Sequence, residues 1–232
     1  MNSRLLFAAV VLSTVLSTAA YPLRVLAWND QVAARKLAIS YSKGTEEFDD
    51  LHPFQRSRVF EINSTKEAPA VIQDLDKKDD KGKPIGAPIL IPEGIKKPLL
   101  ILLPDAKAPC GLRLLTLEDD LVGFSWGSMR MINATGKKLV FKWEEKNISL
   151  PATWTPAQVL PSGDDRNIEV QLFLEDQPDT PVYSAVWEHR SHYRKLIFIM
   201  PNDDPRVGPI ALKFITEDRR AVDAENAAAK AR

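Results

Sequence analysis

A serine flanked by glycines is the feature of this chain whose type and spacing best match a catalytic motif. Residues 123–127 read GFSWG, which fits the G-x-S-x-G turn that presents a nucleophilic serine at the end of a strand. Aspartates and histidines follow in the order of a catalytic triad, at Asp164, Asp165, His189 and His192. The motif requires a helix directly after the serine, but the residues that follow Ser125 are strand-forming. We therefore predict no catalytic residue, and keep as an alternative a serine hydrolase that uses Ser125, His189 and His192.

The two histidines would have a spacing suited to zinc if they lay on a helix. His189 and His192 instead fall between the strand candidates 182–187 and 193–200, so we predict that both lie in a surface turn. A third ligand would have to come from a distant group, Asp49, Asp50 and His52. The sequence therefore predicts neither a metal site nor a cofactor.

Five Asp-Asp doublets could supply the paired carboxylates of a glycosidase or the ligands of a calcium ion. They begin at Asp49, Asp79, Asp119, Asp164 and Asp203. Each doublet lies between apolar runs, where an aspartate accepts hydrogen bonds from nearby backbone amides and stabilises a turn. We predict turn chemistry for all five.

Exposed tryptophans could form a platform on which sugar rings stack. The candidates are Trp126, Trp143, Trp154 and Trp187. Trp143 shares a strand face with Leu139 and Phe141, so we expect it in the core. Trp154 lies in the proline-bounded loop 151–156, which has no apolar period, and is therefore the best exposed candidate for ligand binding. The interpretation that we favour is that its ring plugs against the core.

Short strands are the elements that would position these residues. Residues 139–144 alternate in polarity, because Leu139, Phe141 and Trp143 point to one face and Lys142 and Glu144 to the other. We predict that this strand forms a hairpin with residues 129–132 through the turn-forming run NATG at 133–136.

Further strand candidates follow at short intervals, separated by prolines, which do no harm between strands. They are residues 23–28, 36–42, 57–62, 99–103, 112–117, 168–174, 182–187, 193–200 and 210–215. Such a series without helical periodicity predicts an all-β protein, an antiparallel β-sandwich that is either one large sandwich or two tandem Ig-like ones. No internal repeat of fixed period is visible.

The predicted organisation has four parts. They are a signal peptide at 1–20, an N-terminal β region at 21–118, a C-terminal β-sandwich at 119–216 and a polar tail, helical or disordered, at 217–232. Residues 74–98 are dense in charge, proline and glycine, and predict a long exposed loop or a linker. The runs 99–103 and 112–117 are continuously apolar, which predicts strands covered on both faces.

The amino-terminal segment predicts export. A basic start at Arg4, an apolar run at 5–16 and small residues up to Ala20 have the layout of a cleaved signal peptide, and the run is shorter than the about 20 residues of a membrane span. No later segment is long and apolar enough to span. One cysteine, Cys110, allows no intramolecular disulfide, which favours a bacterial periplasm or cell surface over a eukaryotic secretory route. The predicted location is therefore periplasmic, cell-surface or secreted. Glycosylation is the minority interpretation of three Asn-x-Ser/Thr triplets, at Asn63, Asn133 and Asn147.

These features together resemble those of uncharacterised secreted bacterial β-sandwich proteins. The resemblance rests on the signal segment, the strand ladder and the run GSMRMINAT at 127–135, and covers mainly residues 120–215. It implies the fold and export, and transfers no active-site residue.

The function expected from the sequence is that of a non-enzymatic extracytoplasmic protein with a binding or structural role at the bacterial envelope. Its partner would be an unidentified protein or envelope component. The 31 basic and 31 acidic residues balance, which argues against nucleic acid as a partner. The alternative is a protein that binds envelope or extracellular polysaccharide, or the serine hydrolase described above.

Overall fold

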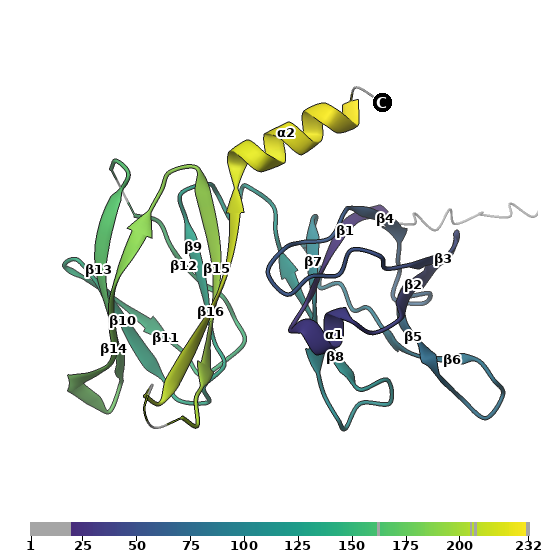
Figure 1. Ribbon diagram of the computed structural model, residues 1–232, viewed down its shortest axis with the longest axis horizontal. Coiled ribbons are helices and arrows are strands. Elements are labelled where there is room, and N and C mark those ends of the chain that lie inside the picture. Colours follow the sequence, from purple (N-terminus) through teal and green to yellow (C-terminus); the bar gives the residue numbers. More distant parts are fainter. Residues whose placement is uncertain (1–19, 162, 205, 207, 231–232) are drawn as a thin grey trace, which may run out of the picture.

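The chain folds almost entirely into β-strands. A computed structural model describes residues 20–161, 163–204, 206 and 208–230. Strands account for 51% of the residues and helices for 7%. The strands form four four-stranded sheets, which Figure 1 shows side by side. The predicted all-β sandwich class is therefore confirmed.

The first half of the chain forms two of these sheets, with the strand orders β4-β1-β7-β8 and β3-β2-β5-β6. Their strands are β1 (Ala20–Ala27), β2 (Leu37–Tyr41), β3 (Gly44–Glu47), β4 (Phe60–Asn63), β5 (Val71–Lys78), β6 (Pro84–Pro88), β7 (Pro98–Pro104) and β8 (Leu112–Glu118). A short helix, α1 (Asp30–Ala33), connects β1 to β2. Apolar side chains from both sheets, among them Val25, Ile39 and Ile72, pack together as the core of this half.

The second half forms the other two sheets, with the orders β12-β9-β15-β16 and β11-β10-β13-β14. Their strands are β9 (Met129–Asn133), β10 (Leu139–Trp143), β11 (Lys146–Leu150), β12 (Ala157–Val159), β13 (Arg166–Leu174), β14 (Gln177–His189), β15 (Tyr193–Pro201) and β16 (Ile210–Asp218). Met131, Phe141 and Val170 belong to the core of this half.

The two halves repeat one topology. Each strand of the second half takes the place of the strand numbered eight lower in the first half, so that β9 corresponds to β1 and β16 to β8. The first and seventh strands of each half run parallel, and the other strand pairs run antiparallel. The repeat is one of strand order and register, which a search for residue periodicity does not detect.

A third apolar cluster lies between the halves and joins them. Leu99, Ile101 and Leu103 of β7 belong to this cluster, whereas Leu100 and Leu102 point into the core of the first half. Strand β7 is therefore covered on both faces, as its continuous apolar run predicts. Strand β15 alternates in the same way between the joining cluster and the core of the second half.

Strand β10 has the expected face assignment, but the hairpin predicted for it is wrong. Leu139, Phe141 and Trp143 are at most 2% exposed, while Lys142 is exposed. Strands β9 and β10 lie in different sheets, so residues 133–136 carry the chain from one sheet to the other. The hairpin partner of β10 is β11, through a turn that includes Glu144 at a φ of 52°.

The side chain of Asn133 shows why the turn signal was misleading. Its Nδ2 donates to the carbonyl oxygens of Lys137 at 2.7 Å and Leu150 at 3.0 Å, and its Oδ1 accepts from the backbone N–H of Thr135 at 3.1 Å. The same local asparagine chemistry stabilises a hairpin and a crossing between sheets. Asn133 is 2% exposed, so the acceptor side chain of its glycosylation triplet is buried in the folded protein.

The exposed loop predicted at 74–98 is wrong over its first half. Strands β5 and β6 pair there as an antiparallel hairpin. Asp79 Oδ1 stabilises the turn by accepting from the backbone N–H groups of Lys81 at 2.9 Å and Lys83 at 2.8 Å. Residues 76–83 are exposed. The high density of charged residues is therefore explained by the exposure of the hairpin tip, and it did not indicate that strands are absent.

The carboxy-terminal tail is helical, one of its two predicted alternatives. Helix α2 (Arg219–Lys230) directly follows β16 and projects from the end of that strand in Figure 1. Of the side chains at 219–228, Val222 is half-buried and the others are exposed. No helix in the described part of the chain is long and apolar enough to cross a membrane. The predicted signal peptide spans residues 1–20, of which 1–19 lie outside the described residues and Ala20 begins β1. Its cleavage therefore stays a prediction.

Candidate functional site

Ser125 lies in the loop between β8 and β9. Its carbonyl oxygen accepts from the backbone N–H of Ser128 at 3.2 Å and from Ser128 Oγ at 2.6 Å, and β9 begins at Met129. The segment after Ser125 is thus a turn and a strand, where the hydrolase motif requires a helix. Among the hydrogen bonds of the described residues, none joins Ser125 to His189 or His192.

The two histidines have different environments, and the surface-turn prediction is wrong for one of them. His189 is the last residue of β14 and is 3% exposed, beside Gly127. His192 lies in the turn before β15, with its Nδ1 3.9 Å from Asp165 Oδ2. In the part of the chain that the structure describes, no group of three or more His, Cys, Asp or Glu side chains could hold a metal ion.

The environment of His189 predicts a pH dependence of stability. Burial lowers the pKa of His189 below its ordinary value of 6.5, so the unfolded chain binds more protons than the folded one between the two values. The free energy of unfolding should therefore fall as the pH is lowered from 7 to about 5. Denaturant titrations at these pH values should show a smaller fall in His189→Gln. The half-exposed His192→Gln is the control, and an equal effect of both substitutions would contradict the prediction.

None of the four candidate tryptophans is exposed. Trp154 is half-buried between the halves, with its ring 6.3 Å from both Trp28 and Phe198 and the guanidinium of Arg113 4.5 Å above it. The loop before β12 thus plugs against the joining cluster, which is the interpretation that the sequence favoured for Trp154. Of the other three, Trp143 and Trp187 are buried and Trp126 is half-buried.

Three of the five Asp-Asp doublets show the predicted turn chemistry, because one carboxylate of each accepts from a backbone N–H two residues ahead in the same turn: Asp79, Asp120 and Asp204. In two other doublets the carboxylates of Asp50 and Asp165 accept from backbone N–H groups 8 and 26 residues away, which tie separate segments together. The doublet of Asp119 and Asp120 has a second role. Its first member, Asp119, points into an ion-pair network between the halves.

That network, which we call the boundary network, consists of Arg24, Arg56, Asp119, Arg194 and Glu217. Arg56 binds Asp119 through two bonds of 2.8 and 2.9 Å, and Arg194 Nη2 lies 3.1 Å from Asp119 Oδ2. Arg194 also binds Glu217, whose other oxygen lies 3.0 Å from Arg24 Nη1. Burial raises the pKa of Asp119, but the guanidinium groups of Arg56 and Arg194 outweigh this effect and hold that pKa below its usual value.

The boundary network links equivalent positions of the repeat. Asp119 lies two residues beyond Leu117, which is opposite Leu99, and Glu217 lies two residues beyond Ile215, which is opposite Leu196. The sequence signal that could have revealed the network is Arg194, a charged residue at the start of the apolar strand β15. On its own it gives no indication of its partners.

Two adjoining hollows run along β16 where the halves meet, and we call them together the boundary groove. The first has a volume of about 470 Å³ and is lined by Trp28, Phe54, Met200, Leu212, Lys213 and Phe214. The second, of about 740 Å³, lies between residues 54–59 of the first half and residues 216–226 of β16 and α2. Phe54, which is 51% exposed, lines both hollows.

Strand β16 offers its free edge to the boundary groove. It is the last strand of the sheet β12-β9-β15-β16. Among the described residues, its backbone makes no hydrogen bond to a segment other than β15. An edge strand carries a row of unpaired N–H and C=O groups on its outer side. The groove therefore combines apolar side chains with backbone groups that are able to pair with another extended chain.

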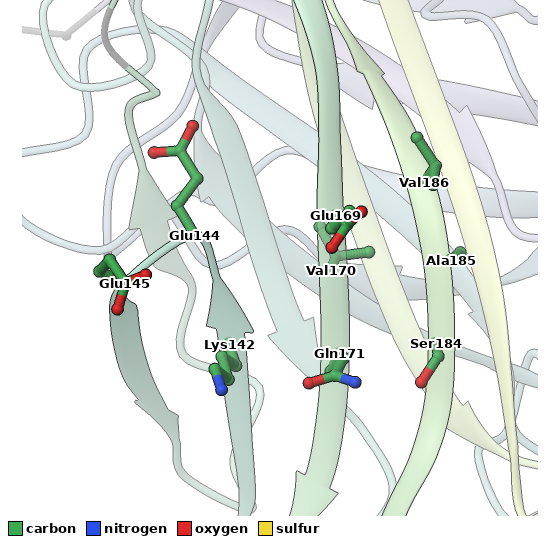
Figure 2. Close-up of a pocket in the computed structure, with 9 residues that line it drawn as sticks. All are labelled: Lys142, Glu144, Glu145, Glu169, Val170, Gln171, Ser184, Ala185 and Val186. Atoms are coloured by element: carbon green, nitrogen blue, oxygen red, sulfur yellow. The ribbon is translucent and has the colours of Figure 1, made fainter.

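A further hollow of about 530 Å³ lies on the outer face of β10, β13 and β14 (Figure 2). Lys142, Gln171 and Ser184 form one row across the three strands, and Glu144, Glu169 and Val186 form the next. The carboxylate of Glu144 binds Arg166. No aromatic side chain lines this hollow, so it offers polar groups without a surface on which a sugar ring could stack.

Comparison of the chain with models of protein families found no match, and a search of curated proteins found no similar sequence.

Proposed function

We propose that this protein is a non-enzymatic extracytoplasmic binding protein that holds an extended polypeptide segment of a partner in the boundary groove. The observation that carries the proposal is the free edge of β16, which forms one wall of two adjoining hollows. Export, with a periplasmic, cell-surface or secreted location, is part of the proposal and is supported by the signal-like sequence of residues 1–20.

A polypeptide is the partner class that this geometry favours. An added strand satisfies the unpaired backbone groups of an edge strand, while pockets beside the edge select its side chains. Residues 212–218 of β16 line the groove almost continuously. At the rise of an antiparallel strand they extend over roughly 24 Å, enough for about seven residues of an added chain.

The groove is formed before a partner arrives, because its two walls belong to halves that are joined firmly. Residues 54–59 come from the first half and β16 from the second. The joining cluster and the boundary network, whose side chains at Arg56, Asp119, Arg194 and Glu217 are 4 to 11% exposed, hold these walls together. A preformed site avoids much of the ordering cost of binding.

The alternatives have weaker support. Polysaccharide binding is favoured only by the polar hollow on the outer face of β10, β13 and β14, which lacks an aromatic platform. The serine hydrolase alternative lacks a hydrogen bond between Ser125 and either nearby histidine of the described chain.

Peptide binding tests the proposal through Phe54. Purified full-length protein is titrated with a panel of fluorescent synthetic peptides of about eight residues that carry alternating apolar side chains. Phe54→Glu should weaken binding by about tenfold or more, since it places a charge in the apolar hollow. Leu160→Glu is the matched control. Leu160 is 57% exposed, close to the 51% of Phe54, and it follows β12, which is the edge strand opposite β16 in the sheet β12-β9-β15-β16. Peptide binding that tolerates Phe54→Glu, or no peptide binding at all, would contradict the proposal.

A further inference from the structure

We infer that the apolar end of the boundary groove recognises the carboxyl terminus of the partner polypeptide, with Lys213 as the carboxylate ligand and an apolar last side chain in the aromatic hollow. This inference rests on the proposed function and names the part of the partner that binds. Three observations support it.

The first observation is the surroundings of Lys213. Its ammonium lies 4.2 Å from the ring centre of Phe54 and 5.6 Å from that of Trp28, and donates to the carbonyl oxygen of Trp28 at 2.8 Å. No carboxylate of the described residues lies within ion-pair distance of this ammonium. Burial lowers the pKa of Lys213, and the more distant charge of Asp30 only partly opposes this effect. A lysine has three donors, so this one keeps donors for an anion.

The second observation is that the fold does not require a charge at this position. Lys213 lies opposite Phe198, and Phe198 lies beside Ile132. The corresponding pairs in the first half place Leu115 opposite Ile101, beside Leu26. Leu115 is therefore the repeat equivalent of Lys213, and it packs as a half-buried apolar residue against the joining cluster. A leucine satisfies the position in one half, so the lysine of the other half has a role beyond packing.

The third observation is the shape of the hollow around Lys213. Lys213 points to the face of β16 that joins the halves, whereas Leu212 and Phe214 pack toward the core of the second half. The hollow thus wraps around the edge of β16 and brings an ammonium beside apolar side chains. A terminal residue carries its carboxylate and its side chain on the same Cα, so one residue meets both features. The preceding residues of the partner would then run antiparallel to β16, toward Thr216 and the second hollow.

The other cations that line the groove do not offer an equivalent site. Arg56 is already bound by Asp119, Arg24 by Glu217 and Arg58 by Glu46. Lys213 is the cation of the groove that has ring faces and a carbonyl oxygen as partners in place of a carboxylate. Charge complementarity therefore favours an anionic group at this end.

The experiment compares peptides of about eight residues that end in Leu, Ile or Phe, each prepared as the free acid and as the carboxyamide. Full-length protein, Lys213→Met and Lys195→Met are titrated by fluorescence anisotropy, with 3-phenylpropionate as a competing apolar carboxylate. Lys195 is the matched control, because its ammonium also binds a carbonyl oxygen, that of Glu188, and burial also lowers the pKa of Lys195.

The free acids should bind the unchanged protein and Lys195→Met about tenfold or more tightly than the amides, the magnitude of a hydrogen bond to a charged group. Lys213→Met should remove that difference. Acids and amides that bind equally would overturn the inference and leave the proposed function standing. Binding of 3-phenylpropionate that depends on Lys213, without binding of any peptide, would overturn both, and would identify a small carboxylate as the ligand.

Discussion

Replacing Asp119 by alanine is expected to destabilise the protein by about 3 to 5 kcal/mol, because removal of one partner from a buried ion pair leaves the opposite charge buried without compensation. Here the substitution would leave two guanidinium groups, those of Arg56 and Arg194, without their shared carboxylate. Glu217 could still bind Arg194, and lies 3.9 Å from Arg56 Nε, so part of the charge would remain balanced.

The neighbouring Asp120 provides a matched control. Asp120→Ala removes a carboxylate that accepts from two backbone N–H groups of the exposed turn, and should cost about 1 kcal/mol. Denaturant titration of the two variants and of the unchanged protein measures the difference in the free energy of unfolding. Because Asp119 connects the halves, we also expect the Asp119→Ala variant to unfold in a broader or two-step transition. Equal costs for the two substitutions would show that the boundary network does not stabilise the union of the halves.

Acid should reproduce part of this effect in the unchanged protein. The folded-state pKa of Asp119 is lowered from 3.8, so its contribution to stability is complete above that value and is lost as the pH falls through the lowered one. Asp119→Ala has already lost this contribution. Its free energy of unfolding should therefore change less with pH below about 4 than that of the unchanged protein.

The sequence predicts the strands well because buried strand positions are occupied mostly by apolar residues and exposed positions mostly by polar ones. The alternation of β10 identifies its buried face, and the continuous apolar run of β7 identifies a strand covered on both sides. For Trp154 the loop has no apolar period, and the plug interpretation rests on the general tendency of tryptophan side chains to be largely buried. These inferences need only the residues of one segment.

The predictions that proved wrong, the hairpin of β10 and the surface position of His189, depended on contacts between segments that are distant in the sequence. Asn133 and Gly136 signal a turn, but the turn chemistry is the same whether the chain returns to the same sheet or crosses to the other. His189 looked like a turn residue because the apolar alternation of β14 ends before it, yet packing beside Gly127 buries it. In both cases the deciding contacts are made by residues far away in the chain.

The boundary groove could not be predicted for the same reason. Phe54 is 158 residues away from Leu212, the first β16 residue that lines the hollow with it, as the difference of their numbers shows. The repeat brings them together, but the repeat itself is visible only as strand order. Lys213 carried no sequence signal, since an alternating strand commonly has a lysine on its exposed face. Its meaning depends on the comparison with Leu115, which requires the register of both sheets.

Replacing Trp143 by alanine is the second large effect that we expect, about 3 to 5 kcal/mol, since the side chain is 2% exposed and its loss leaves a large cavity in the core of the second half. The indole Nε1 has no hydrogen-bond partner among the described residues. An unpaired buried donor carries a penalty of its own, about 1 to 3 kcal/mol. Trp143→Phe removes that donor and keeps most of the apolar volume, so it should cost much less than Trp143→Ala.

Substitutions of the neighbouring Glu144, whose side chain is exposed, test whether Trp143 lies on the buried face of β10. Its carboxylate binds Arg166 at a position where both side chains are 32 to 40% exposed, so Glu144→Ala should cost less than about 1 kcal/mol. Its backbone φ of 52° lies in the region that glycine adopts without strain, so Glu144→Gly should be no worse than Glu144→Ala. Denaturant titrations of the four variants give the order Trp143→Ala, then Trp143→Phe, then the two Glu144 substitutions. A cost for Trp143→Phe as large as that for Trp143→Ala would mean that the indole N–H has a partner, such as a buried water, and contributes to stability through it.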